Sequence, residues 1–402
     1  MITINKKNFK NQKFSILWVS STMLDTSLYK NSLFDILRSF LKLGHVVSLI
    51  GMSSNSFQKT RNLKMRIISV PLRPLPMISR VIFSTIIFLL LPFYIITCKP
   101  DFIIIDSYIP IFGSFSGLFF SKLTKLKIIL DIRSTPVETV GFGGYMFKLL
   151  FSISVLVAKK LFDGITIITP MMKKEVCKNF NLKPKKIGVW TSGVSQNLFD
   201  PKNVTLESAE LKKKLGLSGK FVILYHGVLS ATRGLQESMK AIEILRWKYP
   251  DIVFLILGSG PIVSLLRTMI SEKNLKDNVI IHDTVEQSIV PQFIGLCDVG
   301  LVPLPLNNYW RFQSPLKLLE YLSMGKTVLI SDIPAHRAVI GTEKCGVYIS
   351  SIKQSEIMKS IEYVYHNKQY LDNWGKIGRK IIKKGFTWEK VAKDLETYLL
   401  SI

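Results

Sequence analysis

The chain has 402 residues, of which 48% are hydrophobic, and a formal net charge of +26 at pH 7. This length exceeds one ordinary core, so it excludes a single small domain and predicts two domains of roughly 200 residues each. The four cysteines are scattered along the chain, which excludes a disulfide framework and a cysteine-based zinc site and favours a reducing cytoplasm.

Positive charge is concentrated in the first half, where residues 1–200 hold 27 Lys and Arg against 9 Asp and Glu. A strongly basic surface favours nucleic acid or an anionic membrane as a partner. The sequence contains no recognisable nucleic-acid-binding module and no basic surface interleaved with aromatic residues. We therefore expect a membrane face and no nucleic acid.

The first elements alternate between strand and helix. An apolar run over residues 14–19, too short for a signal-peptide core, predicts a strand. A loop that contains Asp25 follows, then an apolar-periodic helix over 32–43 and a strand over 45–50. Strand, helix and strand at this spacing imply a parallel sheet of the α/β class.

The strongest hydrophobic feature covers residues 81–97, between Arg80 and Lys99. Its 17 residues are at the lower limit of a membrane span, Pro92 interrupts them, and a predicted strand over 102–105 follows at once. A crossing would separate strands of one sheet, so the segment is predicted to be either a fully buried crossover helix or a helix docked in the membrane interface.

Charged residues cluster after another predicted strand, over residues 127–130. Arg133 and Glu138 come shortly after its carboxyl end, which is the usual ligand edge of an open α/β sheet. They are candidates for a substrate cleft, and the alternative is a solvated loop. The polar stretch over residues 200–220 then predicts a domain boundary.

The second half begins with a strand over residues 221–225, followed by a loop with Gly227 and Arg233. A buried strand over 253–257 ends in the turn of Gly258 and Gly260. A guanidinium can bind phosphate oxygens with two hydrogen bonds, so Arg233 is a candidate anion ligand.

The segment from Phe312 to Asp332 carries the clearest site signal. Ser314 is predicted to cap a helix over 315–324 that begins at Pro315 and ends at Gly325. Lys317 in its first turn opposes the helix dipole unless a phosphate binds there. Glu320 shares its face and could accept hydrogen bonds from sugar hydroxyl groups. A solvated Lys317–Glu320 pair on an ordinary helix is the alternative.

The order Ser-Pro-Leu-Lys-Leu-Leu-Glu-Tyr-Leu, then Gly-Lys-x-Val and Ser-Asp-Ile-Pro, resembles the donor-binding segment of retaining GT-B glycosyltransferases of family 4, in the glycosyl transferases group 1 superfamily. The resemblance is dense from Lys186 to Trp388. It implies two Rossmann-like domains that face each other across a cleft, over residues 1–199 and 200–385, with a C-terminal helix over 386–402 that crosses back to the first domain.

The resemblance also implies roles for particular residues. In the family a glutamate at the position of Glu320 binds the donor ribose, and cations at the positions of Arg233 and Lys317 neutralise the donor diphosphate. These three are the expected catalytic residues. The remaining expected donor contacts are Gly227, Gly258, Gly260, Asp283, Thr284, Val285, Ser314, Pro315 and Leu316. On the acceptor side the candidates are Asp25, Arg133 and Glu138.

Two positions depart from the family pattern. Phe312 stands where many members have a first glutamate, and Val228 stands where they have an arginine. No Asp-x-Asp motif occurs in the chain. We therefore expect metal-independent departure of the diphosphate with no cofactor. The resemblance implies in addition that a phosphate oxygen is the base and that the configuration is retained.

The expected activity is transfer of a sugar from a nucleotide diphosphate-sugar to a lipid-linked or surface-polysaccharide acceptor. The expected place is the cytoplasm, peripheral on the inner face of the cell membrane. Two alternatives remain open: a nucleotide-sugar epimerase, and a catalytically inactive GT-B scaffold that binds a partner or the membrane.

Overall fold

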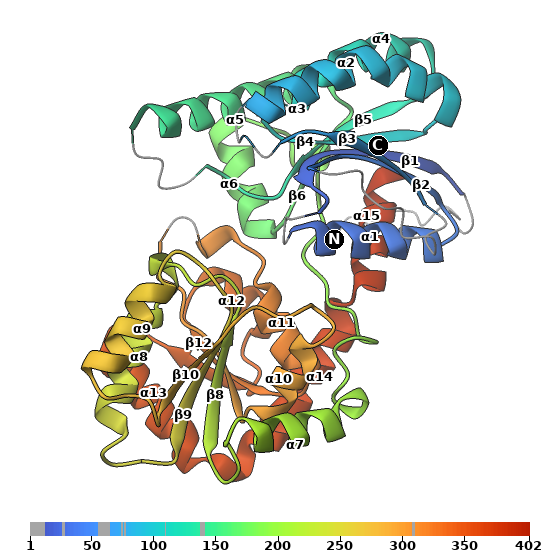
Figure 1. The fold of residues 1–402 in the computed structure, drawn as a ribbon. Coiled ribbons are helices and arrows are strands. Elements are labelled where there is room, and N and C mark those ends of the chain that lie inside the picture. The colour runs from blue at the N-terminus through green and yellow to red at the C-terminus, as the bar shows by residue number, and fades with distance from the viewer. Residues whose placement is uncertain are drawn as a thin grey trace. The chain divides into compact units, whose positions relative to one another are not determined.

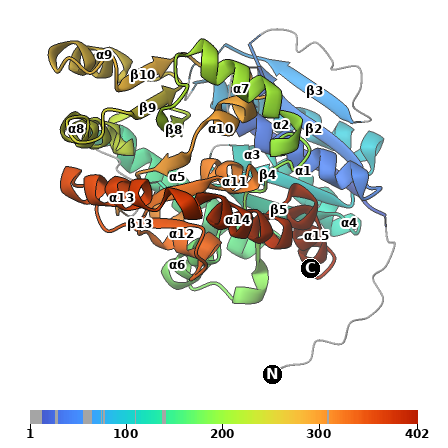
Figure 2. The ribbon, with the colours of Figure 1, turned by 90° about the horizontal axis from the view of Figure 1, so that it is seen from below.

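The computed structural model describes residues 13–25, 29–54, 65–73, 75, 78–108, 110–136, 141–307 and 310–402. The chain divides into two compact units, which are drawn in Figures 1 and 2. The first unit comprises residues 1–191 together with 388–402, and the second comprises residues 192–387.

The first unit is built on a seven-stranded sheet in the order β3-β2-β1-β4-β5-β6-β7, and every neighbouring pair is parallel. Its strands, rich in Ile, Leu and Val, are mostly buried, as expected for a parallel sheet covered on both faces. The strands are β1 (Ser15–Met23), β2 (Val46–Ser53), β3 (Arg66–Pro71), β4 (Phe102–Asp106), β5 (Lys127–Ile132), β6 (Gly164–Ile167) and β7 (Ile187–Val189).

Helices cover both faces of this sheet (Figure 1). One face carries α1 (Tyr29–Lys42) and α15 (Trp388–Leu399), which pack on each other. The C-terminal α15 docks through Tyr398, whose hydroxyl donates to the Lys186 carbonyl oxygen at 2.6 Å. The other helices are α2 (Ile78–Cys98), α3 (Pro110–Gly113), α4 (Phe115–Leu123), α5 (Gly141–Leu161) and α6 (Pro170–Phe180).

Residues 81–97 were predicted to form either a fully buried crossover helix or a helix docked in the membrane interface, and the structure contradicts the first of these. Helix α2 continues through Pro92, and only one stripe of it is buried, including Phe83, Ile87, Leu91 and Ile95. It is long and apolar enough to cross a membrane, yet only 28% of its most apolar stretch is buried. A fully buried crossover helix is therefore wrong.

The second unit has a six-stranded parallel sheet in the order β10-β9-β8-β11-β12-β13. Its strands are β8 (Phe221–His226), β9 (Ile252–Leu257), β10 (Val279–His282), β11 (Val299–Val302), β12 (Thr327–Ser331) and β13 (Gly346–Ile349). The order reverses next to β8, so the carboxyl ends of β8 and its neighbours form the expected ligand edge.

Two hydrophobic clusters lie on opposite faces of this sheet, because alternate residues of each strand point to opposite sides. One includes residues of α7 (Thr205–Lys214), α10 (Val290–Leu296), α11 (Leu316–Ser323), α12 (Pro334–Ile340) and α14 (Leu371–Gly385). The other includes α8 (Leu235–Leu245), α9 (Val263–Glu272) and α13 (Gln354–His366). The predicted α/β class, with two parallel sheets flanked by helices, is confirmed.

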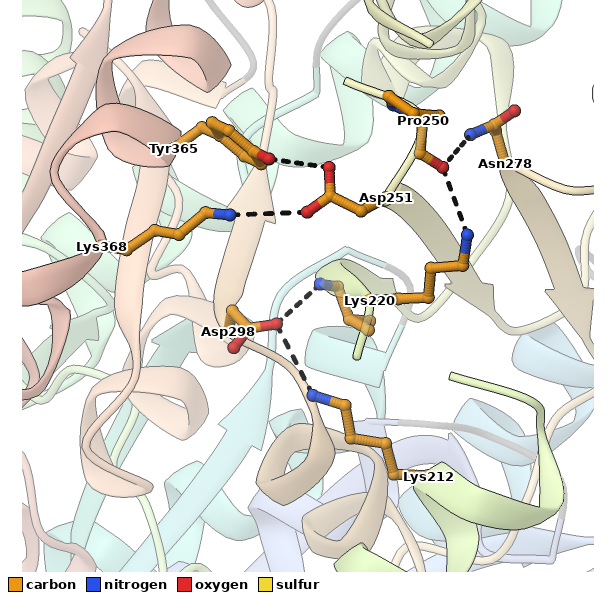
Figure 3. A network of polar contacts seen from close by, with 9 residues as sticks. Lys212, Lys220, Pro250, Asp251, Asn278, Asp298, Tyr365 and Lys368 are labelled. Atoms are coloured by element: carbon orange, nitrogen blue, oxygen red, sulfur yellow. Dashed lines mark hydrogen bonds and ion pairs between the residues drawn. The ribbon is translucent and has the colours of Figure 1, made fainter. Parts of the chain in front are cut away.

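Aspartates at the amino ends of strands tie neighbouring strands together in both sheets. The Asp298 carboxylate accepts from the Val222 N–H at 2.7 Å and lies 3.8 Å from the Lys212 ammonium group (Figure 3). In the first sheet Asp101 and Asp163 accept in the same way from neighbouring strands. Asp251, held by Tyr365 and Lys368, lies in the same network of the second unit. These carboxylates stabilise the fold, at the edge opposite the ligand edge.

Candidate donor site

Loops at the carboxyl ends of β8, β9 and β10 are joined by backbone hydrogen bonds. The Gly227 N–H donates to Leu257, and the Gly258 N–H donates to His282, both at 2.9 Å. Gly227, Gly258 and Gly260 have positive φ values of 116°, 150° and 157°. The three glycines predicted to contact the donor therefore lie at one edge of the second sheet.

The start of α11 differs from the prediction. The helix begins at Leu316, and the preceding Pro315 has no side-chain cap. Ser314 lies one residue before the N-cap position, which Pro315 occupies, and its hydroxyl group accepts from the Ser192 N–H at 3.1 Å. Because the Pro315 side chain has no hydrogen-bond acceptor, it does not cap the N–H groups in the first turn of α11. The end is as predicted, since Gly325 follows the helix with φ 68°.

Lys317 reaches from α11 to the end of β8. Its Nζ atom lies 4.3 Å from the centre of the Tyr225 ring and donates to the Tyr225 hydroxyl oxygen at 3.3 Å. A Cβ atom on Gly227 would be only 3.2 Å from this Nζ, so the glycine leaves room for the ammonium group. Burial, and then the neighbouring Arg233, hold the pKa of Lys317 well below its usual value, while Glu320 opposes this.

Arg233 supplies the second cation, from the turn before α8. Its guanidinium carbon lies 4.8 Å from the centre of the Trp310 ring, and the Trp310 indole N–H donates to the Thr232 carbonyl oxygen at 3.1 Å. Burial raises the pKa of Tyr225 to about 12, and Arg233 opposes that rise. Both cations therefore act on the same phenol ring.

Glu320 lies one turn after Lys317 and is paired with a residue that the sequence did not single out. Its Oε2 atom is 3.4 Å from Nε2 of His226, the last residue of β8. Burial, and then Lys317, lower the pKa of His226 to about 3, so the imidazole is neutral at physiological pH. The structure thus brings the three predicted catalytic residues, Lys317, Arg233 and Glu320, to one strand end.

The predicted base-binding residues follow β10. Asp283 is 79% exposed and pairs with Arg267 at 3.3 Å, and its carbonyl oxygen accepts from the His282 ring. Thr284 is exposed and Val285 is half-buried. Leu316 is 38% exposed, whereas Pro315 is buried. Their contacts to a nucleotide stay predictions.

The two departures from the family pattern have structural explanations. Phe312 is 7% exposed, and the Arg311 guanidinium carbon lies 5.0 Å from the centre of its ring. An apolar ring thus fills the position at which many relatives have a carboxylate. At Val228 the carbonyl oxygen accepts from the Tyr225 hydroxyl at 2.8 Å, so this residue holds the phenol that contacts Lys317.

The acceptor-side candidates lie in the first unit. Asp25 accepts from the Ser54 N–H at 2.8 Å and thereby joins the ends of β1 and β2. The Arg133 guanidinium group stacks 3.5 Å from the Trp190 ring centre and donates to the Trp190 carbonyl oxygen. Glu138 lies outside the described residues. The contacts of Asp25 and Arg133 explain their placement without a ligand, and their role in acceptor binding stays a prediction.

A carboxylate pair at the ligand edge of the first sheet was missed from the sequence. Asp106 and Asp131 are register partners on β4 and β5. Asp106 accepts from the Ser20 hydroxyl and the Ser21 N–H, and Asp131 accepts from Thr166 and Trp190. A signal was present in the sequence, since each aspartate directly follows a run of buried apolar residues within its strand.

Asp106→Asn is expected to stabilise the protein more at pH 8 than at pH 5. Burial raises the pKa of Asp106 to about 7, Asp131 adds to this, and Ser20 and Arg80 oppose it. Between pH 4 and 7 the folded protein retains a proton that the unfolded chain releases, so stability falls as the pH rises. Asparagine does not titrate, so its relative gain should be about 2 kcal/mol.

Urea unfolding of both proteins at pH 5, 6, 7 and 8 measures this difference. The exposed Thr284→Ser, which changes no titratable group, is the control and should leave the difference from wild type constant across the series. A constant difference for Asp106→Asn as well would contradict the raised pKa.

Comparison with known proteins agrees with this geometry. Residues 207–381 match the family described as glycosyl transferases group 1. A glycosyltransferase from Rickettsia africae has the same fold, with a TM-score of 0.75, 16% identity and coverage of 97% of this chain and 99% of its own. HepE of Anabaena, in complex with UDP and glucose, has a TM-score of 0.72, 12% identity and coverage of 97% and 100%.

The chain therefore has the GT-B fold of these glycosyltransferases. Within the second unit, the match to the glycosyl transferases group 1 family covers residues 207–381. The putative glycosyltransferase YtcC of Bacillus subtilis is 26% identical over 261 residues, which cover 61% of this chain. The match spans 62% of the length of that relative.

Proposed function

We propose that this protein is a retaining, metal-independent glycosyltransferase of family 4 that uses a nucleotide diphosphate-sugar. The observation that carries the proposal is the convergence of Lys317, Arg233 and Glu320 at the end of β8. Two basic groups held in place before the ligand arrives can, as cations, stabilise the charge that develops on a departing diphosphate. Glu320 is placed to accept hydrogen bonds from the donor ribose. The UDP bound to HepE supports UDP as the first candidate nucleotide.

In the proposed reaction the acceptor hydroxyl group attacks the anomeric carbon from the face that the diphosphate leaves. The bond between that carbon and the diphosphate oxygen breaks, the glycosidic bond forms, and the hydroxyl proton passes to the departing phosphate. No protein nucleophile is required. Proton NMR of the first product formed would show retained anomeric configuration, and an inverted product would refute this route.

Calorimetric titration with UDP, GDP and ADP in a chelator tests the donor site. We expect wild type to bind one of them, and Glu320→Ala to weaken that binding about tenfold because hydrogen bonds to a carboxylate are lost. Glu272→Ala, at an exposed position of α9, is the matched control and should bind as wild type does.

An inactive scaffold is the second candidate, and Phe312 favours it because a buried ring replaces a carboxylate at a donor position. Failure of folded wild type to bind any of the three nucleotides would support the scaffold and refute the enzyme.

We further propose that the first unit docks on the cytoplasmic membrane face, where a lipid-linked or polysaccharide acceptor would be reached. The face of α2 opposite its buried stripe exposes Leu89 (68%), Phe93 (57%) and Ile96 (61%). Helices α4 and α5 lie on the same side of the sheet as α2 (Figure 1), and they expose further apolar residues: Phe115, Phe119, Leu123, Tyr145, Leu149, Leu156 and Leu161.

Positive charge accompanies this apolar surface. Exposed lysines lie on α4 and α5 or directly follow α2 and α4: Lys99, Lys122, Lys125, Lys148 and Lys160. An apolar surface flanked by lysines matches an interface that contains anionic lipids. This combination supports peripheral docking of α2 in the membrane interface.

A triple variant, Leu89→Ser, Phe93→Ser and Ile96→Ser, is expected to reduce binding to anionic vesicles at least tenfold. Each apolar side chain contributes about 1.5–3 kcal/mol on full burial, and partial burial of three suffices for this change. Flotation with phosphatidylglycerol–phosphatidylcholine vesicles measures it. The control replaces Leu206 and Trp247, which are 76% and 81% exposed in the second unit, with serine. Equal flotation of both variants would contradict docking through α2.

A further inference from the structure

His226 is a buried polar residue in the donor site that needs an explanation. Its side chain is 7% exposed and packs edge-on against the Tyr321 ring, with ring centres 5.0 Å apart. Its Nε2 atom is buried and, within the described part of the chain, makes no hydrogen bond of normal geometry. Phenylalanine could fill the same space without this cost, so a histidine here points to a role in the site.

The charge state of His226 fixes what its ring can do. Because burial and Lys317 keep the imidazole neutral, it has one N–H group and one lone pair. The atom that faces Glu320 is Nε2, at 3.4 Å. A carboxylate only accepts hydrogen bonds, so the favoured tautomer carries its proton on Nε2.

From this geometry we propose that His226 is a positioning residue, which orients the Glu320 carboxylate for the vicinal hydroxyl groups of a nucleotide ribose. The inference rests on the proposed function of the site. In this proposal the Nε2–H group of His226, which faces Oε2 at 3.4 Å, donates to it when the ribose binds and directs the carboxylate toward the ligand. Tyr321 keeps the imidazole in place, since its own hydroxyl group is fixed on the Leu224 carbonyl oxygen at 2.7 Å.

In this arrangement Lys317 is available for the diphosphate and Glu320 for the ribose, although both residues lie on one face of α11. Lys317 and Glu320 are three residues apart on α11, so without a third group they could pair with each other and leave the ribose without an acceptor. Lys317 instead contacts Tyr225, and Glu320 lies beside His226. Two successive residues of β8 thus hold the two charged groups of α11 in separate places.

A comparison of two ligands on matched variants tests the proposal. Calorimetry would use the nucleoside diphosphate that wild type binds among UDP, GDP and ADP, and its 2′,3′-dideoxy analogue. For His226→Phe, which keeps the packing and removes the N–H group, we expect about tenfold weaker binding of the ribonucleotide. The dideoxy analogue should bind wild type and His226→Phe equally, because it lacks the hydroxyl groups that Glu320 would accept.

His226→Gln restores an N–H donor and should bind the ribonucleotide within about threefold of wild type, a rescue that a packing role does not predict. His226→Leu serves in place of His226→Phe should the latter fail to unfold cooperatively. The inference is overturned if the apolar variants bind the ribonucleotide as wild type does, or if they lose the same factor for both ligands. Wild type that binds no nucleotide refutes the proposed function itself, whereas a loss seen only in Glu320→Ala refutes the role of His226 alone.

Discussion

Lys317→Met is expected to weaken binding of a nucleoside diphosphate about 100-fold. The variant keeps the length of the side chain and its packing on the Tyr225 ring but removes a cation from a partly desolvated site. A charge-assisted hydrogen bond to phosphate in such a site contributes about 3 kcal/mol, which corresponds to two orders of magnitude in Kd. Calorimetric titration measures the change. Lys344→Met, at an exposed position of the same unit, should bind as wild type does.

We also expect Lys317 to take up a proton when a nucleoside diphosphate binds. Because burial and Arg233 lower the pKa of Lys317 in the free protein, part of the population is neutral at a pH at which an ordinary lysine is charged. A bound diphosphate favours the ammonium form and raises this pKa again. Affinity should therefore increase as the pH falls toward the pKa of the free protein, and level off below it.

Titration in two buffers of different ionisation enthalpy counts the protons taken up. Wild type should take up a fraction of a proton that grows with pH, and Lys317→Met should take up less at each pH. Equal uptake by the two proteins would assign the proton to another group, for instance to the phosphate itself, and would contradict the lowered pKa of Lys317.

Local signals in the sequence predicted much of the second unit. Gly325 ends α11 as expected, because a residue with positive φ is needed there whatever surrounds it. Ser314 was predicted as the N-cap, but Pro315 occupies that position, and the Ser314 hydroxyl group accepts from the N–H of Ser192, which is 122 residues away. A capping rule considers only the neighbours in sequence and cannot register a competing donor from elsewhere in the fold.

Composition likewise predicted α2 as a helix but not which of its sides is buried. Since almost every residue is apolar, no periodicity distinguishes the stripe of Phe83 and Leu91 from the exposed side. The side of α2 that is buried is the one that approaches two glycines of α3 and α4 closely. A Cβ on Gly113 would lie 2.8 Å from the Ser84 carbonyl oxygen, and one on Gly117 would lie 3.0 Å from Leu91. These close approaches depend on tertiary packing.

In the donor site, too, contacts within one helix could be predicted from the sequence, whereas contacts between distant elements could not. Lys317 and Glu320 could be paired from the sequence because they lie on one helix face. Neither Tyr225 nor His226 was predicted as a site residue, because Tyr225 ends a buried apolar strand and His226 was placed in the loop that follows it. Their place beside Lys317 and Glu320 follows only from the parallel sheet, which brings the end of β8 under α11.

Gly258→Ala is expected to destabilise the second unit by at least about 3 kcal/mol and to abolish nucleotide binding. Gly258 has φ 150°, and a Cβ there would lie 2.0 Å from the Gly227 carbonyl oxygen. Since backbone must move, strain of about 1–3 kcal/mol adds to the displacement of both loops. Gly216→Ala is the matched control: its φ is 67° but nothing lies within 4 Å, so only about 1 kcal/mol is expected.

Urea unfolding followed by circular dichroism, with calorimetry on the folded fraction, separates the two effects. Gly258 also donates to His282, so a shift of its backbone reaches the strand end on either side of β9. Loss of nucleotide binding should therefore exceed what the unfolded fraction explains. Equal effects of the two alanines would mean that the turn tolerates a side chain. The close contact between the loops of β8 and β9 would then not be what orders the donor edge.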